Sequence, residues 1–241
     1  MIEVESLTKL YGDVAAVADL SFIANSGEVL GLVGPNGAGK TTTLRSLSGI
    51  IRPTRGRIRI AGFDLEAQSL EAKACLAFIP DEPRLFDYLT VEEHLRFIAL
   101  LYGVTDPSPR IETLLAELEL SEKRRALPDE LSRGMKQKLA IGCGLLHDPR
   151  ALLLDEPLTG LDPGAIRRMK QTILARARAG TAVILSSHLL HLVEELCDRI
   201  LLIHRGRAVA MGPIADIVAS RPELEGRGLE DVFMALTEAA H

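Results

Sequence analysis

Residues 34–42, GPNGAGKTT, have the composition and spacing of a loop that holds phosphate groups. They fit the pattern G-x-x-x-x-G-K-[ST], in which glycines let backbone N–H groups face phosphate oxygens at close range. Lys40 would then reach the β- and γ-phosphates of a nucleotide, and the hydroxyl of Thr41 would bind Mg²⁺. The residues expected to contact the nucleotide here are Gly34, Pro35, Asn36, Gly37, Ala38, Gly39, Lys40, Thr41 and Thr42.

A second group of chemically active residues ends the run ALLLDEP at residues 151–157. A short, wholly apolar run is typical of a strand buried on both faces, and acids that follow it emerge at the carboxyl edge of the sheet, where α/β folds bind ligands. We assign Asp155 to Mg²⁺, through water, and Glu156 to polarising the attacking water. Phosphoryl transfer asks a protein mainly for this kind of positioning and charge stabilisation.

Between these two motifs lies LSRGMKQKLAIGCGLLHDPR, residues 131–150, and here the chain resembles the ATP-binding subunit of an ATP-binding cassette (ABC) transporter. The hallmark of that family is an LSGGQ-like segment shortly before the Asp-Glu strand. The resemblance implies that Ser132 and Gly134 begin a helix whose N-terminus caps the γ-phosphate bound to a partner subunit, as free N–H groups and a helix dipole can do. Arg133 replaces the second glycine and keeps positive charge near that anion, and Met135 replaces the usual Gln.

The resemblance assigns roles to four further residues. LTGLD resembles the family's D-loop and puts Asp162 at the seam between subunits, while ILSSH puts the imidazole of His188 against the γ-phosphate. Tyr11 matches the aromatic residue that stacks on adenine. Asp81 stands where the family has the glutamine of its Q-loop. We hypothesise that Asp81 accepts hydrogen bonds from Mg²⁺-bound water, because the cation can reverse the repulsion between carboxylate and nucleotide; the alternative is an inert loop acid. The expected catalytic set is Lys40, Asp81, Glu156 and His188, and the metal set is Thr41, Asp81 and Asp155.

The elements that must position these residues alternate between strand and helix patterns. We expect strands at 2–7, within 21–34, and at 56–65, 151–155, 181–187 and 199–212, and helices at 40–48, 90–104, 108–120 and 228–239. Alternation interrupted by a helical block predicts an α/β core with a helical insertion. The resemblance implies a P-loop NTPase (RecA-like) core with a mixed or parallel sheet and an antiparallel N-terminal part. One domain would span 1–215, with its core at 1–83 and 149–215, its insertion at about 84–148 and a helical tail at 216–241.

Composition restricts the class of partner. The 241 residues are 47% hydrophobic and 25% charged with a net charge of −5, which is ordinary globular usage and argues against a broad nucleic-acid surface. The three cysteines show no C-x-x-C spacing and indicate buried thiols in a reducing compartment, and we expect His147, His191 and His204 to be surface residues. The N-terminus does not resemble a secretory signal, and the sequence contains no run of the ~18–20 apolar residues that a spanning helix needs. We therefore expect a soluble chain that reaches a membrane through a partner.

The expected function is ATP binding and hydrolysis that powers an ABC transporter, with ATP and Mg²⁺ as cofactors. Two such subunits, identical or different, would close head to tail on ATP, and an integral membrane permease would dock beside residues 81–102 at the cytoplasmic face of the membrane. The segments LEDVFMAL and IPDEPRLFDYLT resemble exporter subunits, so export is favoured, for a cargo that the sequence does not identify. The alternatives are a soluble ATPase of the same class, such as an iron–sulfur assembly ATPase, a nucleic-acid or translation ATPase, and a small-molecule kinase.

Overall fold

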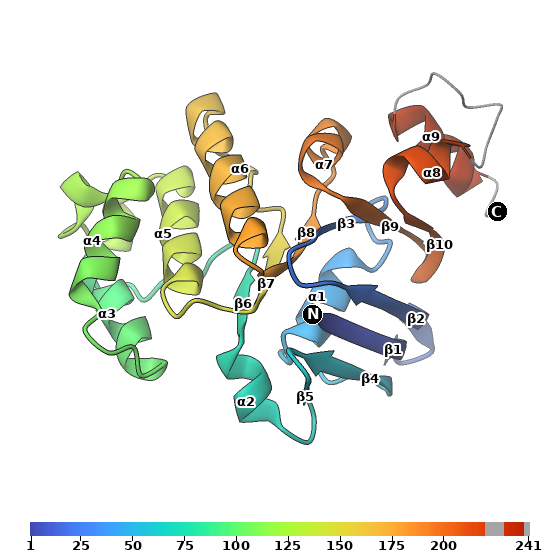
Figure 1. Cartoon of the computed structure of the whole chain (residues 1–241), viewed down its shortest axis with the longest axis horizontal. Helices are drawn as coiled ribbons and strands as arrows, with labels where there is room; N and C mark the ends of the chain where they lie inside the picture. Colours follow the sequence, from blue (N-terminus) through green and yellow to red (C-terminus); the bar gives the residue numbers. More distant parts are fainter. Residues whose placement is uncertain (220–228, 239–241) are drawn as a thin grey trace.

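The computed structural model describes residues 1–219 and 229–238, whose strands form two sheets (Figure 1). The first sheet is antiparallel and has the order β2-β1-β4-β5. Its strands are β1 Ile2–Tyr11, β2 Val14–Ala24, β4 Arg55–Ile60 and β5 Phe63–Asp64. The expected strand at 56–65 is thus two strands, because Ala61 and Gly62 turn the chain with positive φ angles. The strand β2 was not predicted, because residues 21–34 were expected to form a turn followed by a single buried strand, which is β3.

The second sheet has the order β10-β9-β3-β8-β7-β6 and is parallel except for β10. Its strands are β3 Val29–Val33, β6 Leu76–Ile79, β7 Ala151–Asp155, β8 Ala182–Ser186, β9 Arg199–His204 and β10 Arg207–Gly212. Alternate residues of β7 and β8 enter different hydrophobic clusters: Leu152 and Leu154 face one cluster, while Ala151 and Leu153 face the other. Burial on both faces explains why these strands are apolar throughout.

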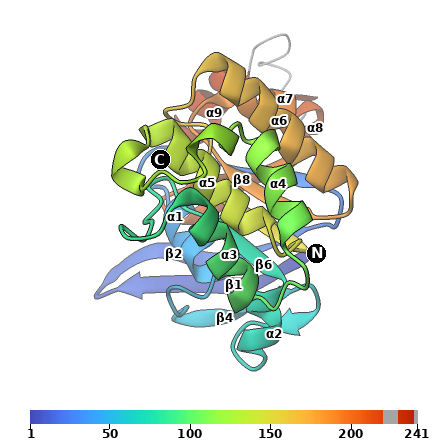
Figure 2. The ribbon, with the colours of Figure 1, turned by 90° about the vertical axis from the view of Figure 1, so that its left-hand side faces the viewer.

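Helices cover the parallel sheet on both faces. They are α1 Lys40–Leu47, α2 Ser69–Ala74, α3 Val91–Leu101, α4 Ser108–Glu117, α5 Arg133–Leu145, α6 Pro163–Arg178, α7 Leu190–Leu196, α8 Ile214–Ala219 and α9 Leu229–Glu238, with single 3₁₀ turns at Ser121–Lys123 and Pro128–Glu130. Figure 2 looks onto α3, α4 and α5, which follow β6 in the chain and precede β7. The expected P-loop NTPase fold, with an antiparallel N-terminal part and helices inserted in mid-chain, is confirmed. Dividing the chain into the domain ranges given above remains a proposal.

Local signals place the helix ends. Thr90 and Glu93 form a capping box at the start of α3, since each side chain accepts a hydrogen bond from the other residue's backbone N–H. Gly49 follows α1 with φ +69°, the left-handed conformation expected of a terminating glycine. α9 confirms the C-terminal helix within the described residues, whereas positions 228 and 239 of that prediction lie outside them. Within the described ranges, none of the helices combines the length and apolarity that crossing a bilayer requires.

Two predictions about individual side chains have different outcomes. The three cysteines were expected to be buried thiols; all three are free, and each is only partly buried. The surface assignment holds for His191 but is wrong for His147, whose ring stacks on Tyr102 with centroids 3.8 Å apart, and for His204, which is half-buried at the end of β9. A sequence reading missed this because Tyr102 and His147 come from the ends of different helices.

Candidate functional site

The glycine-rich loop joins the central strand β3 to α1 and is pressed onto neighbouring backbone on two sides. A Cβ atom at Gly34 would lie 2.3 Å from the carbonyl oxygen of Ile203 in β9. At Gly39, where φ is +110°, it would lie 2.5 Å from the carbonyl oxygen of Ala16 in β2. The N–H of Gly206, in the β9–β10 turn, donates to the carbonyl of Ala38 at 2.9 Å. These contacts require glycine at positions 34 and 39 and fix the path of the loop.

Lys40 is buried at the first turn of α1. Its ammonium group donates to the carbonyl oxygens of Gly34 at 2.7 Å and Pro35 at 3.2 Å, so it lies across the mouth of the loop. Burial lowers the pKa of Lys40, and the carboxylates of Glu156 and Asp155 oppose that shift. Gly39 supplies no side-chain cap to α1, and the first turn of that helix holds no acid. The amino end of α1 therefore offers N–H groups and a cation to an anion.

Asp155 ends β7 with its side chain buried beside two hydroxyl groups. Ser186, opposite it on β8, donates from Oγ to Asp155 Oδ1 at 2.6 Å, and Thr41 Oγ1 lies 3.4 Å from the same oxygen. Ser186 also accepts from the backbone N–H of Glu156 at 3.2 Å. Sequence reasoning did not single out Ser186, although a polar residue ending an apolar strand two positions before His188 was an available signal.

Glu156 follows Asp155 with φ +49°, an unusual angle for a residue with a side chain. Its carboxylate is 16% exposed and lies 2.8 Å from Nδ1 of His188, which extends from the end of β8. Burial raises the pKa of Glu156, and His188 opposes that rise through its charge and hydrogen bond. A carboxylate held by an imidazole and kept partly from water has the properties of a general base.

The starts of α5 and α6 hold four predicted residues: Ser132, Arg133, Gly134 and Asp162. Ser132 caps α5, since its Oγ accepts from the N–H of Met135 at 3.3 Å, so the expected helix N-terminus is present. Gly134 packs against the chain at 160–161, where a Cβ on it would lie 3.2 Å from the carbonyl of Gly160. Asp162, expected at a subunit seam, caps α6 by accepting from Ala165 N at 2.9 Å. These hydrogen bonds from backbone N–H groups hold the pKa of Asp162 below its ordinary value.

The remaining two predicted residues have different surroundings. Asp81 pairs with Arg133, whose guanidinium nitrogen lies 3.4 Å from Asp81 Oδ1. Tyr11 ends β1 with half of its surface exposed, and the ammonium of Lys9 lies 5.2 Å from its ring centroid. The structure therefore brings Lys40, Thr41, Asp155, Glu156 and His188 to one edge of the sheet. Asp81 follows β6, the parallel neighbour of β7, at the same edge, and Tyr11 lies at the end of β1 in the other sheet.

The donor set at the sheet edge fits a nucleotide with Mg²⁺. Thr41 and Asp155 supply hard oxygen atoms close together, which is how Mg²⁺ is held when phosphates and water complete its shell. Among the residues that the structure describes, no three His, Cys, Asp or Glu side chains form a metal cluster. A cation here would therefore depend on ligands from the phosphates as well as on the protein.

Comparison with known proteins identifies the family. Residues 17–159 match the ABC transporter family. The probable multidrug ABC transporter ATP-binding protein YbhF of Escherichia coli is 36% identical over 98% of this chain, which spans only 41% of the YbhF length. The Nod factor export ATP-binding protein I of Paraburkholderia xenovorans is 37% identical over 91% of this chain and 73% of its own. A solved ATP-binding subunit of an ABC transporter has a TM-score of 0.94, with 36% identity over 98% of this chain and 99% of that one. The chain therefore belongs to the ABC transporter family.

Proposed function

We propose that this chain binds ATP with Mg²⁺ and hydrolyses it as the ATP-binding subunit of an ABC exporter. The observation that carries the proposal is the convergence of Lys40, Asp155 and the Glu156–His188 pair at one edge of the parallel sheet. Phosphoryl transfer to water requires a cation for the phosphates, an acceptor for the metal and a base for the water, and this edge supplies all three.

Each residue has a defined task in that reaction. Lys40 would exchange its bonds to two backbone carbonyls for bonds to phosphate oxygens, since the carbonyls are weaker acceptors than an anion. Thr41 and Asp155 would hold the Mg²⁺, which neutralises charge on the β- and γ-phosphates. Glu156 would accept a hydrogen bond from the attacking water, and His188 would hold its carboxylate in place.

Two copies of the chain would complete two sites. Ser132 and Gly134 begin α5 in a group separate from Lys40, so the helix N-terminus and the phosphate loop of one chain would serve different nucleotides. A head-to-tail pair, of identical or different subunits, would place each α5 N-terminus against the nucleotide of its partner. ATP would favour the closed pair because each γ-phosphate would bind both subunits, and hydrolysis would remove that link.

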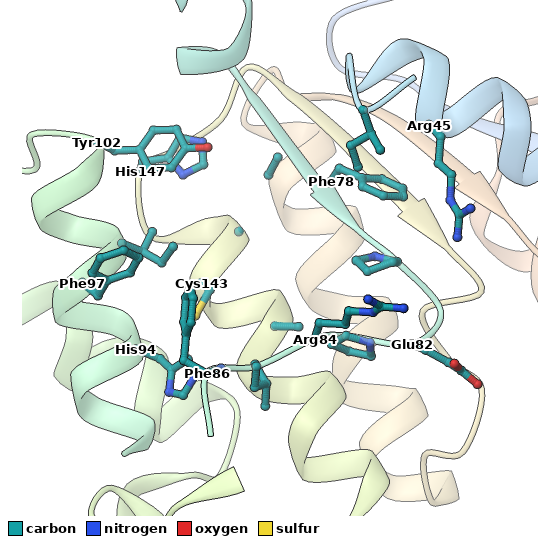
Figure 3. Close-up of a pocket in the computed structure, with 18 residues that line it drawn as sticks. Arg45, Phe78, Glu82, Arg84, Phe86, His94, Phe97, Tyr102, Cys143 and His147 are labelled. Carbon is teal, nitrogen blue, oxygen red and sulfur yellow. Dashed lines mark hydrogen bonds between the residues drawn. The ribbon is translucent and has the colours of Figure 1, made fainter. Parts of the chain in front are cut away.

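The permease would dock in the groove shown in Figure 3, a cavity of about 600 Å³ between the sheet and the helices α3 and α5. Phe86 and Phe97 meet edge to face at 5.3 Å on its wall, and the stacked pair of Tyr102 and His147 closes one end. Tyr88, which is 93% exposed, extends the apolar surface beside it. Large exposed apolar surface around a hollow marks a contact with another protein, and a docked permease would hold the chain at the cytoplasmic face of the membrane.

The direction of transport is proposed from the relatives. One relative is named for the export of Nod factor, and another is named as a probable multidrug transporter subunit. An outward direction for this chain agrees with both names, and with the exporter-like segment at residues 229–236.

Two measurements test the proposed function. The purified chain should hydrolyse ATP in the presence of Mg²⁺, and Lys40→Ala should abolish nucleotide binding. Purification from detergent extracts should recover a membrane protein with the wild type and lose it when Phe97 is changed to Glu, while ATP hydrolysis in solution persists. Recovery of no membrane protein with the wild type would favour the alternative of a soluble ATPase of the same family.

A further inference from the structure

An ion pair joins the beginning of α5 to the segment that follows β6. Arg133, the first residue of α5, places its guanidinium 3.4 Å from the carboxylate of Asp81. Both side chains are partly exposed, so the pair is accessible to salt and to substitution. It bridges 52 positions of sequence.

A second contact supports the same junction. Gln137, which is 2% exposed, lies one helical turn after Arg133 and places Nε2 3.5 Å from the carbonyl oxygen of Pro80. Residues four apart lie on the same face of a helix. Two successive turns of α5 thus contact two successive residues, Pro80 and Asp81, and hold them along the helix.

The stem of Arg133 also lies against the loop 157–162, which follows Glu156. A Cβ on Gly160, where φ is +78°, would lie 3.2 Å from Cδ of Arg133 and 3.3 Å from its Nε. Next in the chain, Gly134 meets the carbonyl of Gly160 and the side chain of Leu161 equally closely. Arg133 therefore contacts both Asp81, through the ion pair, and the loop that follows Glu156, through its stem.

The segment 80–84 in turn forms one wall of the groove. Pro80, Glu82, Pro83 and Arg84 all line it, and Figure 3 shows Glu82 and Arg84 following β6 along its edge. A protein seated in the groove would therefore press on residues adjacent to Asp81. A rigid contact through Arg133 would pass that displacement to the loop 157–162.

We propose that Arg133 is a positioning residue whose ion pair with Asp81 couples the occupied groove to the Glu156 loop. This rests on the proposed function, since it describes how docking regulates hydrolysis at the same site. It assigns Asp81 a partner of opposite charge within its own chain, in place of the role toward metal-bound water.

The test is a double-mutant cycle read by two methods. The variants are Asp81→Asn, Arg133→Gln, the combination of both, and the exchange Asp81→Arg with Arg133→Asp. Arg52→Gln is the matched control, since Arg52 is an exposed arginine that pairs with Glu66 on another part of the surface. Hydrogen–deuterium exchange of amides 80–89 without nucleotide reads the junction directly, and steady-state kcat and KM read its effect on hydrolysis.

We expect each single variant to speed exchange at 80–89 and to lower kcat by roughly 1.5- to 5-fold, the usual worth of an exposed ion pair, with KM little changed. The combined variant should cost no more than either single one, and the charge exchange should restore slow amide exchange. The differences should vanish in about 0.5 M salt, where such pairs are screened. Arg52→Gln should behave as wild type in both measurements.

Two results would overturn the pairing. One is additive effects in the combined variant. The other is loss of turnover in Asp81→Asn while Arg133→Gln matches wild type, since Asp81 would then act on the metal without Arg133. If the wild type itself hydrolyses no ATP, the proposed function fails, but amide exchange still decides whether the two side chains act as a pair.

Discussion

Replacing Ser186 by alanine tests the hydrogen bonding around Asp155, the acid that we propose binds Mg²⁺. Ser186 is fully buried, and its hydroxyl donates to Asp155 at 2.6 Å. The alternative donor, Thr41, is 3.4 Å away, too far to compensate fully. Losing a hydrogen bond to a charged group costs about 1.5–3 kcal/mol. The folding equilibrium constant should therefore fall roughly 10- to 150-fold, and the Mg²⁺ concentration needed for half-maximal hydrolysis should rise.

The matched control is Ser187→Ala at the next position. Ser187 is also buried, but its hydroxyl only accepts from the backbone N–H of Leu189 at 3.1 Å. A bond between neutral groups is worth about 0.5–1.5 kcal/mol, so Ser187→Ala should cost less and leave the Mg²⁺ requirement unchanged. Urea denaturation measures both losses, and a Mg²⁺ titration of ATP hydrolysis measures the second effect. Equal losses in the two variants would refute the assignment of a special role to the bond with Asp155.

Other variants examine the base, its partner, the loop and the thiols. Glu156→Gln should keep nucleotide binding and lower kcat roughly 10²- to 10⁴-fold, the usual contribution of a general base; near-normal turnover would contradict the role. Burial raises the pKa of Glu156, so the rate of ATP hydrolysis should begin to fall on acidification at a pH above the range in which an ordinary glutamate is protonated. His188 opposes that rise, so His188→Ala should move the fall in rate to a still higher pH. Gly37→Ala is the control for Gly39→Ala, since both glycines have positive φ but a Cβ at position 37 would meet no other atom. Gly39→Ala should lower the free energy of unfolding by about 1–3 kcal/mol more than the control does, and equal losses would refute close packing as the cause. Burial raises the pKa of the Cys143 thiol to about 12, so alkylation at pH 8 should be much slower in the folded chain than in the chain unfolded by urea, and equal rates would contradict this.

Sequence patterns were most informative at positions where the chemistry or the local packing requires one particular type of residue. The loop 34–42 and the acids ending β7 were both predicted from local spacing, because the physics that requires them acts over a few residues. β7 and β8 were predicted for the same reason, since burial on both faces leaves an unbroken apolar run.

Interactions between distant segments were not predictable in this way. Ser186 bonds Asp155 only because β7 and β8 pair in a register that sets these residues opposite each other. The Arg133–Asp81 pair depends on how α5 packs against the end of β6, and the stack of Tyr102 on His147 depends on two helix ends meeting. Each is decided by tertiary packing, which short patterns in one sequence do not encode.

The contacts of the phosphate loop with Ala16, Ile203 and Gly206 also determine when the site can exist during synthesis. Synthesis of the loop is complete at residue 42. The backbone that supports it, in β9 and the β9–β10 turn, is synthesised only with residues 199–206. At common rates of translation, roughly 10–30 s separate the two events. A nascent or truncated chain that ends before β9 carries the whole motif and the support at Ala16, but lacks the backbone of Ile203 and Gly206. ATP can therefore stabilise this protein only after residues 199–206 have been made.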